Sequence, residues 1–546
     1  MTATTVAAAT SGSALTGTAA LARFMLRQDR IRIAAWILSL TVFTVGAAAS
    51  FPQNYPTAAD RQTIAATMDT PASIAMLGVN YGGVDGYTYG AMVSHQMLAF
   101  STIVVGLMSV LLLVRHTRTE EATGRAELVR GNVVGRHAAT TAALIVVAVA
   151  NVLLAALMAV GLGASGIDTV TWAGSLLFGT AHAAVGLVFA SIAAVAVQVT
   201  EHPRGASGMA IAAIGLAYGL RAIGDIGDGT LSWLSPVGWA QATQVYVNDR
   251  WWPLLVAVAA TILLVAVAFA LSTRRDVGAG LRAPRPGTPA ASNALANPLG
   301  FALRLHRANL IGWAVAMFVL GTMYGSVLAD AEQMLGSNEA MTELLAAIGG
   351  ANVAETFAAL ITTIMAIFAA IYAVIAAQRM RSEETAGRAE PVLATGLSRT
   401  RWVASHLAIA MIGSAVVLLA GALGLGLAGA AATEDASLLP RLLGAALAYA
   451  PALWVAIAAV AALYGLLPRA SALAWVIVGY SFIVTYLGAI LQFPDWMNDL
   501  SPFGHIPQLP VDELTLTPLF VLTAITAGLI AVGLATFRHR DLQSPA

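Results

Sequence analysis

The sequence predicts an all-α polytopic membrane protein whose twelve transmembrane helices form two tandem six-helix repeats. Three observations support this fold class. Of the 546 residues, 58% are hydrophobic and only 10% are charged, whereas soluble domains carry about 25% charged residues. Twelve segments are long and apolar enough to cross a bilayer as helices. A charged motif that follows the second segment recurs after the eighth segment.

The twelve expected spans are apolar runs that reach the roughly 20 residues needed to cross a bilayer. They comprise residues 31–50, 94–114, 137–161, 171–199, 206–226, 252–272, 308–328, 357–377, 402–430, 440–465, 470–491 and 517–537.

The distribution of arginine orients these spans. If the N-terminus is cytoplasmic, the inner segments hold 24 of the 28 arginines and 10 of the 28 acidic residues. Such a bias follows the positive-inside rule and predicts a multi-pass protein of the plasma (inner) membrane with both termini cytoplasmic. Residues 14–30 are expected to form an amphipathic helix on the inner membrane surface. A flexible tail is the alternative for residues 1–13.

The two halves of the chain match each other in order and spacing. Residues 118–127 (RTEEATGRAE) align without a gap with residues 381–390 (RSEETAGRAE), and further matches lie before, between and after the other spans. The repeat is therefore parallel, with an axis along the membrane normal. We expect a first half at 1–277, a Gly- and Pro-rich cytoplasmic linker at 278–300 and a second half at 301–546.

The composition excludes several kinds of chemistry. The chain contains no cysteine, and all of its basic residues are arginine. It therefore cannot form the lysine-containing P-loop of ATPases, a lysine Schiff base or a cysteine-ligated zinc site. No catalytic cluster and no metal site is predicted, and the balanced charge gives no reason to expect nucleic acid. An enzyme is not expected.

The repeated loop has two interpretations. Glu and Arg at three- and four-residue spacings can pair on a short helix along the membrane surface, giving a self-paired, solvated loop. Alternatively, its recurrence indicates that both copies face a related cytoplasmic partner.

The loops and the six-plus-six plan resemble ABC-2-type exporter permeases, in particular the fused, double-length permeases of polyketide-antibiotic (tetronasin-type) exporters of actinobacteria. The resemblance covers nearly the whole chain. It implies that each loop is a coupling helix docking on an ATP-binding subunit. The implied coupling residues are Arg118, Glu120, Glu121, Gly124, Arg125, Glu127, Arg381, Glu383, Glu384, Gly387, Arg388 and Glu390.

Because the chain has no lysine, an ATPase that drives it must be another polypeptide. We therefore expect two copies of a separate ATP-binding subunit, which would hold ATP and Mg, and no cofactor in this chain. Pro391 stands where the first half has Leu128, which suggests that the second coupling helix stops a turn earlier.

In similar exporters the pathway is lined by the second and fifth spans of each half. The candidates here are Phe100, Met108, Met209, Tyr218, Met365, Phe368, Tyr372, Trp475, Tyr480 and Phe482. Such a lining suits hydrophobic small molecules such as antibiotics and drugs, although each residue alone is also compatible with ordinary packing.

Two further features of the sequence have more than one interpretation. The outer loops after spans 1 and 7 contain weakly amphipathic stretches, residues 60–68 and 338–348, and could act as an outer gate or as shielding connectors. Arg221 and Asp225 are expected to pair at i, i+4, and His182 is either a hydrogen-bonded bundle residue or a proton relay.

The expected function is that of the transmembrane subunit of an ATP-driven exporter. A proton-coupled multidrug transporter of the major facilitator type is the alternative, since it also has six plus six spans. The EE-containing loop and the scarcity of carboxylates within spans argue against it. A membrane-embedded transferase would need a catalytic constellation that the sequence does not show.

Overall fold

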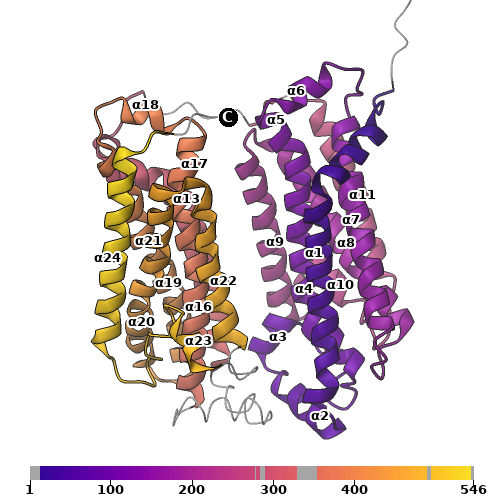
Figure 1. Cartoon of the computed structure of the whole chain (residues 1–546). Helices are drawn as coiled ribbons and strands as arrows, with labels where there is room; N and C mark the ends of the chain where they lie inside the picture. Colours follow the sequence, from indigo (N-terminus) through magenta and orange to yellow (C-terminus); the bar gives the residue numbers. More distant parts are fainter. Residues whose placement is uncertain (1–12, 277, 283–288, 329–352, 488–493, 543–546) are drawn as a thin grey trace, which may run out of the picture. The chain divides into compact units, whose positions relative to one another are not determined.

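The computed structural model describes residues 13–276, 278–282, 289–328, 353–487 and 494–542. These residues form helices and connecting loops, with no strand among them. The chain divides into two compact units, Met1–Pro286 and Gly287–Ala546, and the division lies within the 278–300 segment. Each unit is described separately (Figure 1).

The first unit is a bundle of six long helices with shorter helices at its two ends. Its elements are α1 (Thr18–Asn54), α2 (Ala58–Thr67), α3 (Pro71–Leu77), α4 (Tyr89–Val114), η1 (Arg115–Thr119), α5 (Glu120–Ala122), α6 (Arg125–Arg130), α7 (Ala138–Gly163), α8 (Trp172–Val199), α9 (Pro203–Ile226), η2 (Leu231–Leu234), α10 (Pro236–Gln241) and α11 (Pro253–Ser272).

The second unit repeats the order of the spans. Its described elements are α12 (Asn293–Ala296), α13 (Pro298–Ser326), α16 (Val353–Ala377), α17 (Arg379–Thr385), α18 (Ala389–Leu393), α19 (Arg399–Thr433), α20 (Leu438–Ala448), α21 (Ala450–Leu466), η4 (Pro468–Ala474), α22 (Trp475–Leu487), α23 (Asp495–Asp499) and α24 (Leu516–His539). Here α20 and α21 together correspond to the single helix α8, and η4 and α22 to α9.

The fold class predicted from the sequence is confirmed. Twelve helical stretches of the described chain are long and apolar enough to cross a membrane. Each overlaps one of the twelve expected spans, and the Gly- and Ala-rich segments 206–226 and 440–465 are among them. The expected amphipathic stretch at 338–348 lies outside the described residues.

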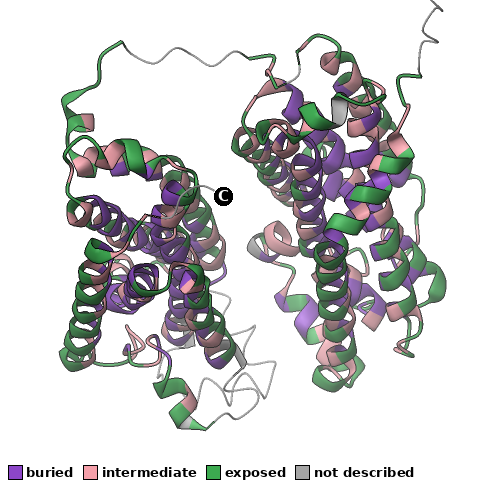
Figure 2. Ribbon diagram, turned by 45° about the horizontal axis from the view of Figure 1, so that its top comes forward, coloured by how far each residue is buried: buried purple, intermediate pink, exposed green. Residues whose placement is uncertain are grey.

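The long helices of each unit are buried to different degrees. In the first unit, α4 and α8 are the most deeply buried long helices, and α11 is the least buried. In the second unit, the span formed by α20 and α21 and the span that begins with α16 are buried to a similar degree. Buried faces point into each bundle and exposed faces point outward, as Figure 2 shows. Apolar outward faces suit a lipid environment.

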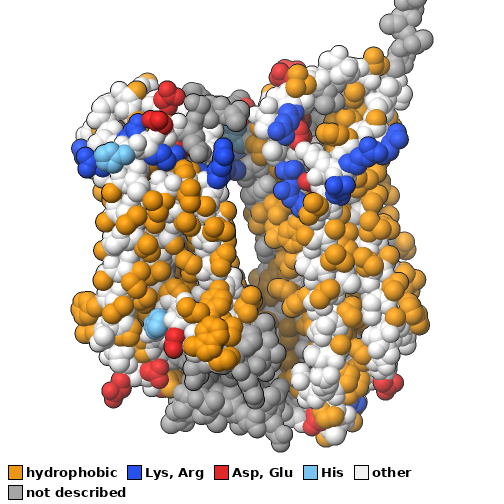
Figure 3. Space-filling view, in the orientation of Figure 1, with side chains coloured by type: hydrophobic (Ala, Val, Ile, Leu, Met, Phe, Trp, Pro, Cys, Tyr) orange, Lys and Arg blue, Asp and Glu red, His pale blue; other side chains and the backbone are white. Residues whose placement is uncertain are grey.

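Charge is concentrated at the ends of each unit. Arginine side chains gather at the end of the first unit that carries α5 and α6, and at the end of the second unit that carries α17 and α18 (Figure 3). Between the ends, the visible surface of each unit is mostly hydrophobic. The loops rich in arginine are those expected on the cytoplasmic side, and we call this the inner end of each unit.

The first helix bends at a buried charge. Asp29 has non-helical angles (φ −106°, ψ 15°) inside α1 and separates residues 18–28 from the apolar span. Its carboxylate lies 2.8 Å from Arg115 Nε and 3.0 Å from His116 Nε2 at the inner end of α4. The expected amphipathic segment at 14–30 is thus helical from Thr18, and an ion pair holds its junction with the span.

The beginning of the linker is part of the first unit. The amides of Leu281 and Arg282 donate hydrogen bonds to the carbonyls of Gln198 and Val199 at the end of α8, at 2.9 and 3.0 Å. The carbonyl of Ala279 accepts a bond from Arg118 at 3.1 Å. The first residues of the segment predicted as a linker are therefore fixed to the first unit by these contacts.

Candidate functional site

The repeated charged loops form the same turn in both units. In each, a short helix at the end of a span is followed by a glycine and a second short helix: α5 then α6, and α17 then α18. Gly124 has φ +75° and Gly387 has φ +69°, in the left-handed region that L side chains avoid. Each glycine amide donates to the carbonyl three residues earlier, at 3.1 and 2.9 Å. The glycine of the motif is therefore required by the turn.

The second glutamate of the first loop ties the loop to two other helices. The Glu121 carboxylate accepts hydrogen bonds from Arg118 at 2.5 Å and from both terminal nitrogens of Arg275 at 2.9 and 3.0 Å. Arg118 is buried and also donates to the Val197 carbonyl near the end of α8, at 2.6 Å. Arg275, which follows α11, donates to the Gln198 side chain at 2.6 Å. These charge-assisted bonds fix the loop to α8 and α11.

The corresponding glutamate of the second loop has an equivalent role. Glu384 is buried and accepts hydrogen bonds from the Tyr464 hydroxyl of α21 at 2.5 Å and from Arg540 at 2.8 Å. Arg540 follows α24 as Arg275 follows α11, so the pairing of loop and last span is repeated. Arg381, the equivalent of Arg118, donates to the Ser471 hydroxyl at 3.2 Å.

The first glutamate of each motif differs between the units. Glu120 is partly exposed and lies 3.8 Å from the exposed Arg125. Glu383 is buried and pairs with Arg379 and Arg388 at 2.7 Å each. The hydrogen bond from Arg388 to this carboxylate raises the pKa of the guanidinium. The interpretation of a self-paired loop thus describes the second unit more closely than the first.

One face of each second helix is free to contact a partner. Glu127 and Leu128 are exposed on α6, and Leu128 has 77% of its surface accessible. Glu390 and Pro391 are exposed on α18. The second helix of each loop thus has exposed side chains, while the loop itself is anchored to its unit.

The expectation that α18 stops a turn before α6 is wrong. Counted by the offset of 263, α6 ends at Arg130 and α18 ends at the equivalent Leu393. Pro391 is the third residue of α18, where the amide has no partner within the helix to lose. The proline therefore removes a leucine side chain from the surface without shortening the helix.

A further repeated contact lies just beyond each loop. Arg136 donates to the carbonyls of Ser272 and Thr273 at the end of α11, at 3.3 and 3.0 Å. Its equivalent Arg399 donates to the Arg540 carbonyl at the end of α24. Arginine near a helix C-terminus satisfies carbonyls that have no partner within the helix. The comparison of the two halves of the sequence did not indicate this role of Arg136 and Arg399.

The candidate pathway residues fall into two groups. Met108, Met365 and Tyr372 are fully buried within their own units. Phe100, Met209, Trp475 and Phe482 are exposed on the surfaces of their units. Tyr218, Phe368 and Tyr480 are partly buried, and the hydroxyls of Tyr218 and Tyr480 bond to backbone carbonyls at 2.9 and 2.7 Å. A lining role for these ten residues stays a prediction.

Two intramembrane polar residues have structural partners. His182 is fully buried, and its ring nitrogens lie 2.6 Å from the Ser101 hydroxyl and 2.7 Å from the Phe178 carbonyl. These contacts agree with the interpretation of His182 as a residue held by hydrogen bonds within the helix bundle. Arg221 pairs with Asp225 at 3.3 Å, as predicted. The described residues contain no cluster of three or more potential metal ligands.

Comparison with known proteins identifies relatives of the chain. A family model described as the C-terminal domain of the multidrug efflux system permease Rv1217c matches residues 295–538. The multidrug efflux system permease protein Rv1217c of Mycobacterium tuberculosis (strain ATCC 25618 / H37Rv) is 41% identical over 538 residues, which cover 97% of this chain and 96% of the relative.

Proposed function

We propose that this chain, which belongs to the family of the multidrug efflux system permease Rv1217c, is the membrane-spanning subunit of an ATP-binding cassette exporter. The cargo is a hydrophobic small molecule such as an antibiotic or a drug. ATP and Mg bind to two copies of a separate ATP-binding subunit, one at the inner end of each unit. The permease is of the ABC-2 type and resembles the fused permeases of polyketide-antibiotic exporters.

The repetition of one anchored loop carries this proposal. Both loops are fixed to the last span of their own unit, through Glu121 with Arg275 and through Glu384 with Arg540. Force applied to such a loop reaches the bundle directly, because the ion pair joins the loop to a spanning helix. Two equivalent loops suit two copies of the same partner.

The absence of lysine supports a separate source of energy. A P-loop needs a lysine on the nucleotide phosphates, and this chain has none. Energy from ATP must then enter through a bound partner, and the exposed faces of α6 and α18 are the surfaces that we assign to it. The proposed site of action is the plasma membrane, with both termini in the cytoplasm.

Co-purification tests the proposal. The tagged full chain, isolated in mild detergent from cells that also express its genomic neighbours, is expected to bring down a P-loop protein. Leu128→Glu combined with Pro391→Glu should reduce the bound partner by at least tenfold, since a central contact contributes 1.4 kcal/mol or more. Leu514→Glu, a similar change at an exposed residue before α24, serves as the matched control.

The alternative mechanism predicts a different result. A proton-coupled transporter would be purified alone, and its efflux would stop when the proton gradient is dissipated at constant ATP. A chain that exports drugs in this way, without a P-loop partner, would contradict the proposal.

A further inference from the structure

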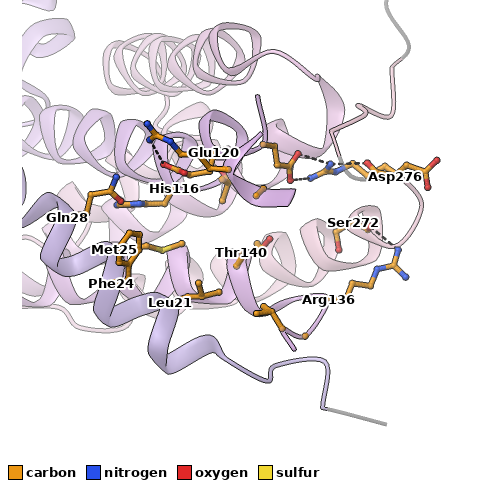
Figure 4. Close-up of a pocket in the computed structure, with 18 residues that line it drawn as sticks. Leu21, Phe24, Met25, Gln28, His116, Glu120, Arg136, Thr140, Ser272 and Asp276 are labelled. Carbon is orange, nitrogen blue, oxygen red and sulfur yellow. Dashed lines mark hydrogen bonds and ion pairs between the residues drawn. The ribbon is translucent and has the colours of Figure 1, made fainter. Parts of the chain in front are cut away.

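A cavity of about 360 Å³ opens at the inner end of the first unit. Residues 18–28 of α1 form one side, and η1, the α5–α6 loop and the ends of α7 and α11 form the others (Figure 4). Its volume is in the range of small-molecule sites. It lies entirely within the first unit.

The cavity has an apolar side and a polar side. Leu21, Phe24 and Met25 line it from α1, the helix expected at the membrane surface (Figure 4). Phe24 is 64% exposed, so the apolar side continues onto the outer surface of the helix. The opposite side carries His116 and Glu120. An occupant with an apolar body and a polar group would match both sides.

The charged groups of the wall balance in number. They are three arginines and three carboxylates: Arg125, Arg136, Arg275, Glu120, Glu121 and Asp276. Arg275 bonds to Glu121, Arg136 donates to backbone carbonyls of α11, and Arg125 lies 3.8 Å from Glu120. Asp276 has no ion pair among the described residues. Glu120 and Asp276 therefore keep carboxylate oxygens that can accept hydrogen bonds from a donor group on an occupant.

His116 adds a buried group that lacks a partner. The residue is 2% exposed, and its Nδ1 has no hydrogen-bond partner among the described residues. Its Nε2 lies 3.0 Å from the Asp29 carboxylate but does not meet it in hydrogen-bond geometry, and a proton on Nε2 leaves Nδ1 as an acceptor. Arg32 and Arg115, which also contact Asp29, do not line the cavity. A donor on the occupant would satisfy the orphaned nitrogen.

The second unit fills the corresponding space with its own side chains. Ala139 and Ser272 line the cavity. The equivalent residues, by the offsets of 263 and 265, are Trp402 and Phe537, which are buried with stacked rings 6.0 Å apart. Small residues at these two positions therefore keep the space open in the first unit.

We propose that this cavity binds the protonated amine of an amphiphile that is dissolved in the inner leaflet. The ammonium group lies between Glu120 and His116, and the apolar body lies against α1. A lipophilic amine drug and the headgroup of phosphatidylethanolamine share this chemistry. The proposal concerns binding alone and does not depend on the source of energy for transport.

Binding of a fluorescent amine tests the site. The full chain is placed in phosphatidylcholine nanodiscs and titrated with a dodecane diamine that carries a dansyl group on one nitrogen and a free amine on the other. The comparison probe has its second nitrogen acetylated and therefore has no charge. The free amine is expected to bind at least tenfold more tightly. Glu120→Gln should weaken amine binding about tenfold, because it removes one partner of a charge pair. Equal binding of the two probes would overturn the proposal.

Two further comparisons separate a specific site from general effects. Ala139→Trp, which copies the second unit, should abolish binding, and Asp276→Asn should weaken it more than the equivalent Asp541→Asn. Thermal unfolding identifies a misfolded Ala139→Trp protein, in which case Glu120→Gln and Asp276→Asn decide the result. Unchanged affinity in both would contradict the proposal. Phosphatidylethanolamine that displaces the probe identifies a lipid site, and failure to displace it identifies a drug site; both support amine binding.

Discussion

Glu121 and Glu120 are neighbours in the sequence but have different tasks in the structure. Glu121 joins two arginines of the inner end, one of which is fully buried, whereas Glu120 faces the cavity beside an exposed arginine. Removing Glu121 leaves the Arg118 charge buried without its carboxylate partner. Removing Glu120 leaves only Arg125, which water already solvates.

We therefore predict that Glu121→Ala destabilises the first unit by about 3–5 kcal/mol, as expected for breaking a buried pair. Glu120→Ala is the matched control and should change the apparent Tm little. Thermal unfolding of the purified protein measures both. In a double-mutant cycle, Glu121→Ala and Arg275→Ala should be less damaging together than the sum of the two single changes. Additive effects would mean that the ion pair does not anchor the loop.

The glycines of the two loops give a second prediction at this scale. Gly124→Ala and Gly387→Ala should each destabilise the turn by about 1–2 kcal/mol, because an L side chain is placed at positive φ. A Cβ at Gly124 would meet no atom within 4 Å, and Asn tolerates the left-handed region. Asn variants should therefore be milder, as measured by thermal unfolding. Equal losses for Ala and Asn would contradict a conformational cause.

At the scale of single elements, α3 shows how the outer end of the first unit is closed. The Ile74 carbonyl accepts the Gly78 amide at 2.8 Å, and side chains from neighbouring elements bind the last carbonyls of the helix. Arg221 donates to Ile74, Ala75 and Met76, and Gln241 donates to Leu77 at 2.6 Å. The loop after span 1 is thus held as a shielding connector in this conformation, which favours that interpretation over a free lid.

Arg221→Met, which keeps the length of the side chain and removes its donors, should release α3. Amides of residues 72–78 are expected to exchange with deuterium about tenfold faster, since buried carbonyls lose their hydrogen bonds. Arg441→Met is the matched control, because Arg441 is a half-exposed arginine that pairs with Glu355 in the second unit. Unchanged exchange in 72–78 would show that the other contacts suffice to hold the helix.

The elements themselves were predictable to different degrees. Apolar length alone located the spans, because a helix that crosses a bilayer needs a long run without charge. The bend at Asp29 was not predictable, since its partners Arg115 and His116 are more than 80 residues away. The end of α18 was predicted wrongly because Pro391 was taken as a terminator without knowing that it falls in the first turn.

At the scale of the whole chain, the repeat made the candidate loops visible before the fold was known. It could not show that Glu121 and Glu384 are anchors, because their partners Arg275 and Arg540 become neighbours only after folding. Nor could it show the cavity, which depends on two small residues opposite two aromatic ones. Residues that differ between the halves thus mark a feature of one unit, such as the cavity. Residues that the halves share mark a feature of both units, such as the anchored loop.

The orientation of the chain yields the last prediction, and the absence of cysteine makes it simple to test. Single cysteines can be added without removing any native one. Thr123→Cys and Ser382→Cys, both exposed in the inner loops, should react with a membrane-impermeant maleimide only after intact cells are permeabilised. Asp85→Cys and Asp435→Cys, exposed at the opposite ends of their units, should react from outside. Opposite accessibility of Thr123 and Ser382 would require an odd number of crossings between the loops, which is incompatible with a parallel repeat of six spans and with two equivalent cytoplasmic docking surfaces.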